Sequence, residues 1–166
     1  MLIRLLLVAS VVASTLGARI PSIIIPAQSE SFSVDVDLAR VRPKLLAAAS
    51  DQSKDILLDL DGIEAERSPN VYFEVYIYAK GADRGRTVGN LALYGSGIRS
   101  ETRGAFRPAH MQLVITEDVR DALQKSSKIT IAFVARGAGG TATTARSACD
   151  VRIGKPVILI TSRTRG

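Results

Sequence analysis

The 166-residue chain is poor in the residues that most often build catalytic and metal centres. It has one cysteine, Cys149, one histidine, His110, two methionines and no tryptophan, and aromatic residues make up only 5% of it. A single cysteine excludes an internal disulfide and leaves the redox compartment open. A single histidine excludes zinc sites built from several histidines, and it leaves His110 as the only base for a nucleophilic triad, with no motif around it.

The chain also lacks any concentration of charge. Its net charge of +6 comes from 22 basic and 16 acidic residues that are scattered along the sequence. Binding to nucleic acid is typical of a clustered basic stripe with interleaved aromatic residues, so we predict no nucleic-acid partner. With 46% hydrophobic residues and few aromatics, the composition indicates one globular domain with a core of Val, Ile, Leu and Ala.

The first residues resemble a secretory signal peptide. "MLIRLLLVASVVASTLGAR" contains Arg4, an apolar run from Leu5 to Ala13 and then small residues. The apolar run is too short for a membrane span. We expect a leader over residues 1–18, a secreted or periplasmic location, and no membrane partner once the leader is removed. The alternative is that this stretch is an apolar part of a longer protein, of which the chain is a fragment.

The remaining sequence predicts short strands. After an extended lead-in over residues 19–30, apolar and polar residues alternate at 31–38, 55–62, 71–81, 87–95, 110–116, 128–137 and 149–161, the last broken near Gly154 and Pro156. We expect one short helix from Thr116, which acids follow, and no more than one helical turn at residues 45–49. The pattern predicts an all-β, mainly antiparallel fold, a sandwich or small barrel over residues 31–161, with a frayed tail at 162–166.

One strand, "VYFEVYIYAKG" at residues 71–81, carries three of the chain's four tyrosines on a single face. Successive side chains of a strand point to opposite sides, so one face is apolar and the other holds Tyr72, Glu74, Tyr76 and Tyr78. Tyrosine combines a large apolar ring with a polar tip and is frequent at protein interfaces. The face is therefore either a contact surface for a partner or a second core layer of the sandwich.

The candidates for metal binding are weak. "DLDGIEAE" brings four acids close together but does not match a calcium loop, and we expect Asp59 and Asp61 on the solvent side of a strand and Glu64 and Glu66 in a turn. A soft copper site could use His110, Met111 and Cys149; the alternative is a histidine at the start of a strand and two ordinary apolar residues. We predict no catalytic residue and no bound cofactor.

The serial order of several segments resembles a known family. "LLDLDGIEAERSPNVYFEVYIY" is followed by "VGNLALYG", "HMQLVITEDVRDAL", "ITIAFVARG" and "VRIGKPVIL". In this order they resemble the C-terminal domain that follows the di-copper domain of tyrosinases and polyphenol oxidases, most closely the bacterial type. The resemblance covers residues 30–160.

The resemblance implies a non-catalytic accessory domain that shields or assists a tyrosinase-type di-copper catalytic domain, on the same or a separate chain. That catalytic domain holds its copper through six histidines, so copper would belong to the partner and this chain would not be an enzyme. Some relatives insert an aromatic side chain into the entrance of the copper site. The candidates here are Tyr72, Tyr76 and Tyr78, or Phe106 in the loop that begins at Tyr94. An exported copper carrier and a secreted ligand- or protein-binding sandwich are the alternatives.

Overall fold

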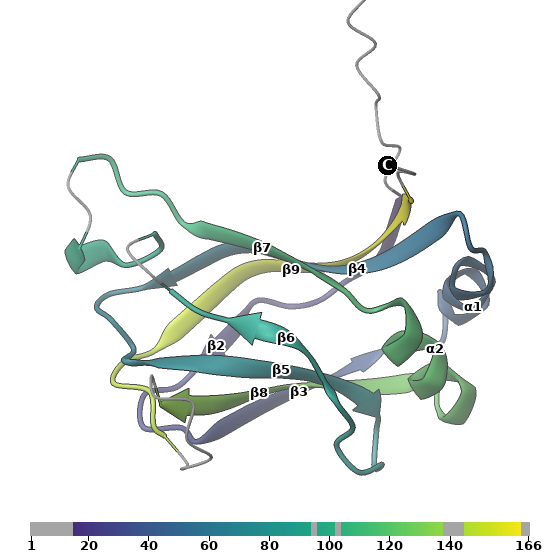
Figure 1. Ribbon diagram of the computed structural model, residues 1–166, viewed down its shortest axis with the longest axis horizontal. Helices are drawn as coiled ribbons and strands as arrows, with labels where there is room; N and C mark the ends of the chain where they lie inside the picture. Colours follow the sequence, from purple (N-terminus) through teal and green to yellow (C-terminus); the bar gives the residue numbers. More distant parts are fainter. Residues whose placement is uncertain (1–14, 94–95, 102–103, 138–144, 164–166) are drawn as a thin grey trace, which may run out of the picture.

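The computed structural model describes residues 15–93, 96–101, 104–137 and 145–163. Its strands form two antiparallel sheets that lie one above the other (Figure 1). The first sheet has the order β1-β9-β4-β7, with β2 also paired to β9, and consists of β1 (Thr15–Arg19), β2 (Ile23–Ile25), β4 (Lys54–Ala65), β7 (Ala109–Val114) and β9 (Val151–Ser162). The second has the order β3-β8-β5-β6 and consists of β3 (Ser31–Asp37), β5 (Val71–Ala79), β6 (Thr87–Leu91) and β8 (Lys128–Gly137). The predicted all-β fold is confirmed, and of its two forms the sandwich is observed.

The core lies between the two sheets and follows from the alternation of the strands. In β5 the side chains of Phe73, Val75 and Ile77 are buried, while the residues between them are only half-buried. In β4 the same alternation buries Leu58 and Leu60 against the second sheet. Each of these two strands therefore contributes one apolar face to the core, as expected for a sheet with one side packed on a core.

Two helices lie together at one end of the sandwich (Figure 1). They are α1 (Arg42–Ser50) and α2 (Thr116–Lys125), and a short 3₁₀ helix, η1 (Arg99–Glu101), follows β6. The expectation of a single turn at residues 45–49 was wrong, because Pro43 lies in the first turn of α1, where a helix needs no N–H donor. The burial of Leu45 and Ala48 then stabilises the full helix. No helix in the described part of the chain is long and apolar enough to cross a membrane.

Two glycines set the shape of the first sheet. Gly62 has a φ of +69°, a value that glycine adopts without strain, and its backbone lies against Gly154 of the neighbouring strand. Leu60 and Ile63 both point into the core although they are three residues apart, so the strand changes face between them. The pairing of β9 is not broken near Gly154, since β9 continues as one strand and pairs with β4 on both sides of this point. The expected irregularity is a change of face, because Ile153 and Pro156 are both buried although they are three residues apart.

The sandwich begins earlier than residue 31. Strand β1 pairs with β9 from Thr15–Ile160 to Arg19–Val157, and β2 pairs with β9 between Ile23 and Ile25. The stretch expected as the end of a leader and an extended lead-in thus contains two strands of the first sheet. Cleavage after residue 18 stays a prediction.

Candidate functional site

The four residues Tyr72, Glu74, Tyr76 and Tyr78 of β5 lie on the outer side of the second sheet, and we call them the tyrosine face. They alternate with the buried residues of β5, so they point away from the first sheet. All four are half-buried. The face is thus held by a strand that is paired with β8 on one side and β6 on the other, rather than by a loop.

The tyrosines lie beside small residues of β8. Tyr76 is opposite Ala132, and Tyr78 is opposite Thr130. Although it is on the outer side of the sheet, Ala132 is only 4% exposed. Side chains directly opposite each other in an antiparallel pair are in contact, so large rings beside a small residue shield it from water. We attribute the burial of Ala132 to this shielding, which also restricts the rings.

A polar network orders the middle of the tyrosine face. The hydroxyl of Tyr76 donates a hydrogen bond to Glu74 Oε2 at 2.7 Å, and Arg136 Nε donates to the same oxygen at 2.8 Å. The guanidinium of Arg84 lies 5.4 Å from the centroid of the Tyr76 ring. At neutral pH the face therefore presents phenol rings, one ionised carboxylate and two cations in fixed positions.

The network changes the acidity of its members. The hydrogen bond from Tyr76, and then the contact with Arg136, hold the pKa of Glu74 below its usual range despite partial burial. The same hydrogen bond and the loss of solvent raise the pKa of Tyr76. Both effects favour the arrangement in which Glu74 is charged and Tyr76 is a neutral donor.

Phe106 belongs to a different part of the molecule. Its ring centroid is 4.2 Å from the guanidinium carbon of Arg99, which in turn pairs with Glu64 Oε2 at 2.6 Å. Glu64 lies in β4, so Phe106 is attached to the end of the first sheet, whereas the tyrosine face lies on the second. Tyr94 lies outside the described residues.

The acids of "DLDGIEAE" all take part in the first sheet or directly follow it. Asp59 and Asp61 lie on the outer side of β4, as predicted. The turn expected at Glu64 was wrong, since Glu64 still lies in β4 and pairs with Arg152 of β9 in the strand register. Glu66 follows the end of the strand. These acids are spread along a strand and do not surround a common point.

The three weak copper candidates do not converge. His110 is exposed on the outer side of β7, where its Nε2 is 2.6 Å from Asp59 Oδ1. Met111 follows it and packs against the core, on the other side of the strand. Cys149 is buried, and its Sγ is 3.0 Å from the carbonyl oxygen of Arg67. Over the described ranges, no three or more His, Cys, Asp or Glu side chains are grouped to hold a metal ion.

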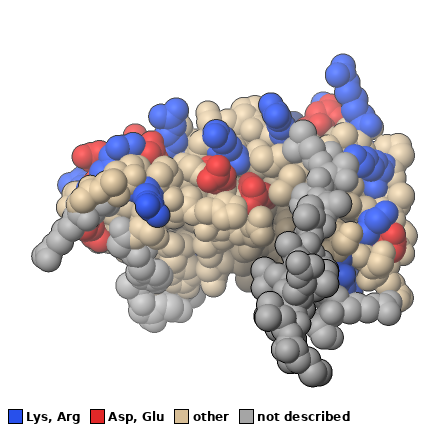
Figure 2. Space-filling model, turned by 90° about the horizontal axis from the view of Figure 1, so that it is seen from above, with Lys and Arg blue, Asp and Glu red and all other residues tan. Residues whose placement is uncertain are grey.

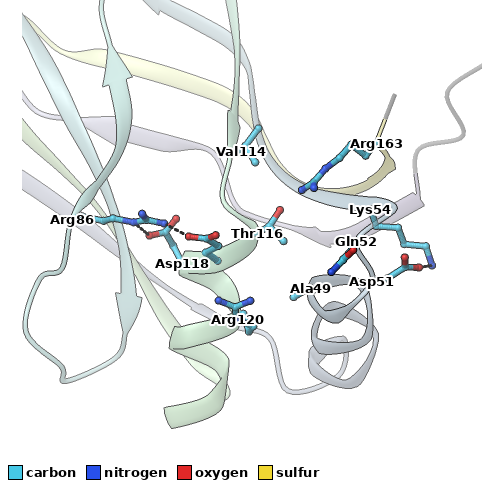
Figure 3. A pocket seen from close by; sticks show the side chains of 11 residues that line it. Ala49, Asp51, Gln52, Lys54, Arg86, Val114, Thr116, Asp118, Arg120 and Arg163 are labelled. Atoms are coloured by element: carbon cyan, nitrogen blue, oxygen red, sulfur yellow. Dashed lines mark hydrogen bonds and ion pairs between the residues drawn. The ribbon is translucent and has the colours of Figure 1, made fainter. Parts of the chain in front are cut away.

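A polar cleft of about 300 Å³ lies where α1 ends and α2 begins (Figure 3). Arg163, at the end of β9, donates to Asp55 at 2.6 Å and lowers the pKa of that carboxyl. Hydrogen bonds from Ser53 lower the pKa of Asp51 to about 2. Other charged residues of the cleft come from several elements: Lys54, Arg86, Glu117, Asp118 and Arg120.

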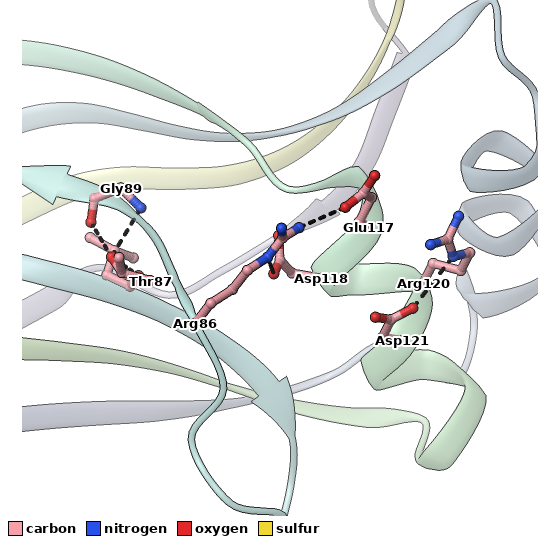
Figure 4. A network of polar contacts seen from close by, with 8 residues as sticks. Arg86, Thr87, Gly89, Glu117, Asp118, Arg120 and Asp121 are labelled. Carbon is pink, nitrogen blue, oxygen red and sulfur yellow. Dashed lines mark hydrogen bonds and ion pairs between the residues drawn. The ribbon is translucent and has the colours of Figure 1, made fainter.

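The cations of the cleft are paired with carboxylates. Arg86, just before β6, reaches across to the first turn of α2 and contacts Glu117 at 2.7 Å and Asp118 at 3.2 Å (Figure 4). These contacts raise the pKa of Arg86. Because each of the cations that line the cleft contacts at least one carboxylate, these contacts join α2 to the sheets and leave none of the cations to a ligand. Sequence analysis missed the cleft, since its members are scattered along the chain and follow no motif.

Comparisons with known proteins give only a partial likeness. No family model matches the chain, and no curated protein matches it. Among solved structures it is similar to latent aurone synthase (polyphenol oxidase) from a natural source, with 11% identity and a TM-score of 0.47 over 84% of this chain and 26% of the oxidase. A recombinantly expressed latent aurone synthase gives 11% identity and a TM-score of 0.46, over 86% and 26% of the two chains. The chain spans about a quarter of the length of these oxidases.

Proposed function

We propose that this chain is a non-catalytic accessory domain that binds a tyrosinase-type di-copper catalytic domain, on the same or a separate chain, and limits access to its copper site. The serial order of segments over residues 30–160 supports the choice of partner. The observation that supports binding to a partner is the tyrosine face, which points outward and lies on a strand that is paired on both sides. With one histidine in the chain, copper belongs to the partner.

The tyrosine face has the properties of an interface centre. Tyrosine is enriched among the residues that carry most of the binding energy, because its ring buries a large area and loses little rotational freedom. Here Tyr76 is already held by Glu74 and lies beside Arg84, so binding orders it little further. A rigid face of this kind obstructs an entrance by occupying it and needs no chemistry of its own.

The test uses a purified, active tyrosinase-type oxidase from the source of this chain. Its rate of phenol oxidation is measured while increasing amounts of the chain are added. We expect the rate to fall in a saturable way. Replacing Tyr76 and Tyr78 by alanine is expected to weaken the inhibition at least about tenfold, as for loss of an interface centre. Ile24→Ala is the matched control, because Ile24 is an exposed apolar residue of the first sheet.

A second variant decides which element enters the partner. Phe106→Ala leaves the tyrosine face intact, because Phe106 lies against Arg99 at the end of the first sheet. We expect it to inhibit as the wild-type chain does. An oxidase rate that is unchanged at saturating amounts of the chain would refute the shielding role. Inhibition that is lost only in Phe106→Ala would move the contact from the tyrosine face to the loop.

Export belongs to the same proposal. The leader expected over residues 1–18 would place the chain in the secreted or periplasmic compartment. Mass spectrometry of the chain from its native source tests this, with a mature N-terminus at or near residue 19 as the expected result. A chain that retains Met1 would contradict export through a cleaved leader.

A further inference from the structure

The outer side of the first sheet carries an apolar row where polar residues are expected. Val114, Leu57 and Leu159 lie side by side in register across β7, β4 and β9. Val114 is 60% exposed, and Leu57 and Leu159 are half-buried. Val157, two residues before Leu159, points the same way. A sheet with one face on the core normally presents polar residues on the other, so a continuous apolar row there indicates a contact surface.

Two charged pairs lie further along β4 and β9 on the same face, beyond the level of Asp59 and Val157. Asp61 of β4 is in register with Lys155 of β9, and Glu64 with Arg152. The acids all belong to β4 and the bases to β9. Within the described part of the chain, Asp61, Lys155 and Arg152 take part in no ion pair. Figure 2, which looks down on this side of the molecule, shows acidic and basic side chains close together on an otherwise uncharged surface.

We propose that this surface binds a second copy of the chain, and that the first sheets of the two copies stack about a two-fold axis running along the strands between β4 and β9. Such an axis places β4 over β9 of the second copy at the same level. Leu57 then lies over Leu159 of the second copy, and Asp61 over its Lys155. Sheets of natural proteins stack in this aligned way with their side chains in contact.

The distribution of charge favours this axis over the other two-fold arrangement. An axis across the strands would place β4 over β4, which would bring the acids of one copy against the acids of the other. An axis along the strands places the acids of β4 against the bases of β9 and each apolar row against itself. A symmetric dimer requires a surface that is complementary to itself, here both in charge and in apolar contact. The axis across the strands is disfavoured because it places like charges against one another. The proposal does not rest on the proposed function, because the tyrosine face lies on the other sheet.

The first test is the mass of the full chain in solution, measured by sedimentation over a range of concentrations. We expect a monomer–dimer equilibrium that Leu57→Asp weakens at least about tenfold. Ser33→Asp is the matched control, because it adds the same charge at an exposed position on the outer side of the second sheet. It is expected to leave the equilibrium unchanged. A wild-type chain that stays monomeric at millimolar concentration, or a dimer that Leu57→Asp leaves intact, would overturn the proposal.

The second test is specific to the axis. Asp61→Lys and Lys155→Asp are each expected to weaken the dimer, since each places like charges against one another. When the two variants are mixed, Lys at position 61 of one copy meets Asp at position 155 of the other, and the remaining contact is the native pair. The mixture is therefore expected to associate at least about tenfold more tightly than either variant alone. Within each variant chain, positions 61 and 155 carry the same charge whether or not the variants are mixed. Only contact between copies therefore explains tighter association of the mixture. If the mixture associates no more tightly than the single variants, this axis is excluded.

Discussion

The carboxylate of Glu74 is the residue on which the order of the tyrosine face depends. One of its oxygens accepts hydrogen bonds from both Tyr76 and Arg136, and its side chain is 22% exposed. We expect Glu74→Gln to lower the free energy of unfolding by about 1 kcal/mol at neutral pH. Because the folded-state pKa is lowered, the contribution is present above the unfolded pKa and is lost as the pH falls through the folded value.

Urea unfolding of the wild type and the variant measures this difference as a function of pH. The gap between them should be largest near neutral pH and should close in strong acid, where Glu74 is protonated. Glu117→Gln, on the exposed side of α2, is the control and should change stability little. A gap that persists at low pH would mean that the charge of Glu74 is not what stabilises the face.

Position 97 requires glycine both because of its backbone conformation and because neighbouring atoms leave no room for a side chain. Its φ is +76°, and a Cβ added there would lie 2.8 Å from the carbonyl oxygen of Ile63. Gly81 has a φ of +82° with nothing within 4 Å of the added atom. We expect Gly81→Ala to cost about 1 kcal/mol for the backbone alone, and Gly97→Ala to cost roughly 2–4 kcal/mol because a steric term is added. Equal losses in thermal or urea unfolding would show that the contact with Ile63 relaxes freely.

At the scale of elements, α2 is joined to the first sheet through its first residue. Thr116 Oγ1 accepts a hydrogen bond from the backbone N–H of Ile56 at 2.9 Å, and Ile115 donates its N–H to the carbonyl of Ile56. Thr116→Val keeps the shape of the side chain and leaves the N–H of Ile56 without its acceptor. We expect a loss of roughly 1–2 kcal/mol, and faster amide hydrogen exchange at Ile56. Thr116→Ser retains the hydroxyl and is expected to lose clearly less.

Elements with a half-buried face could be predicted from the sequence, and elements that depend on their neighbours could not. Strand β3 was predicted to within one residue, because the alternation at residues 31–38 directly reflects one face packed on the core and one exposed face. Helix α1 was predicted too short, since its two buried residues, Leu45 and Ala48, give little periodicity. Strand β1 was interpreted as part of a leader, because apolar residues before Arg19 fit both a leader and a strand.

The same distinction applies to the candidate sites. The tyrosine face could be predicted because its residues follow one another on a single strand. The polar cleft could not, since its ion pairs join residues such as Arg163 and Asp55 that lie 108 positions apart. The apolar row was also missed, because Val114, Leu57 and Leu159 come from three strands and meet only through the sheet order.

At the scale of the whole molecule, the two proposed surfaces lie on opposite sides of the sandwich. A dimer formed through the first sheets leaves the tyrosine face of each copy pointing outward, away from the dimer axis. If both proposals hold, each dimer binds two tyrosinase-type catalytic domains, and the mass of the complex measured by light scattering corresponds to two of each. Leu57→Asp should reduce this to one of each and leave the inhibition per chain unchanged, because it alters only the first sheet. A wild-type complex with one catalytic domain per dimer would instead mean that the two surfaces overlap or that the dimer covers one tyrosine face.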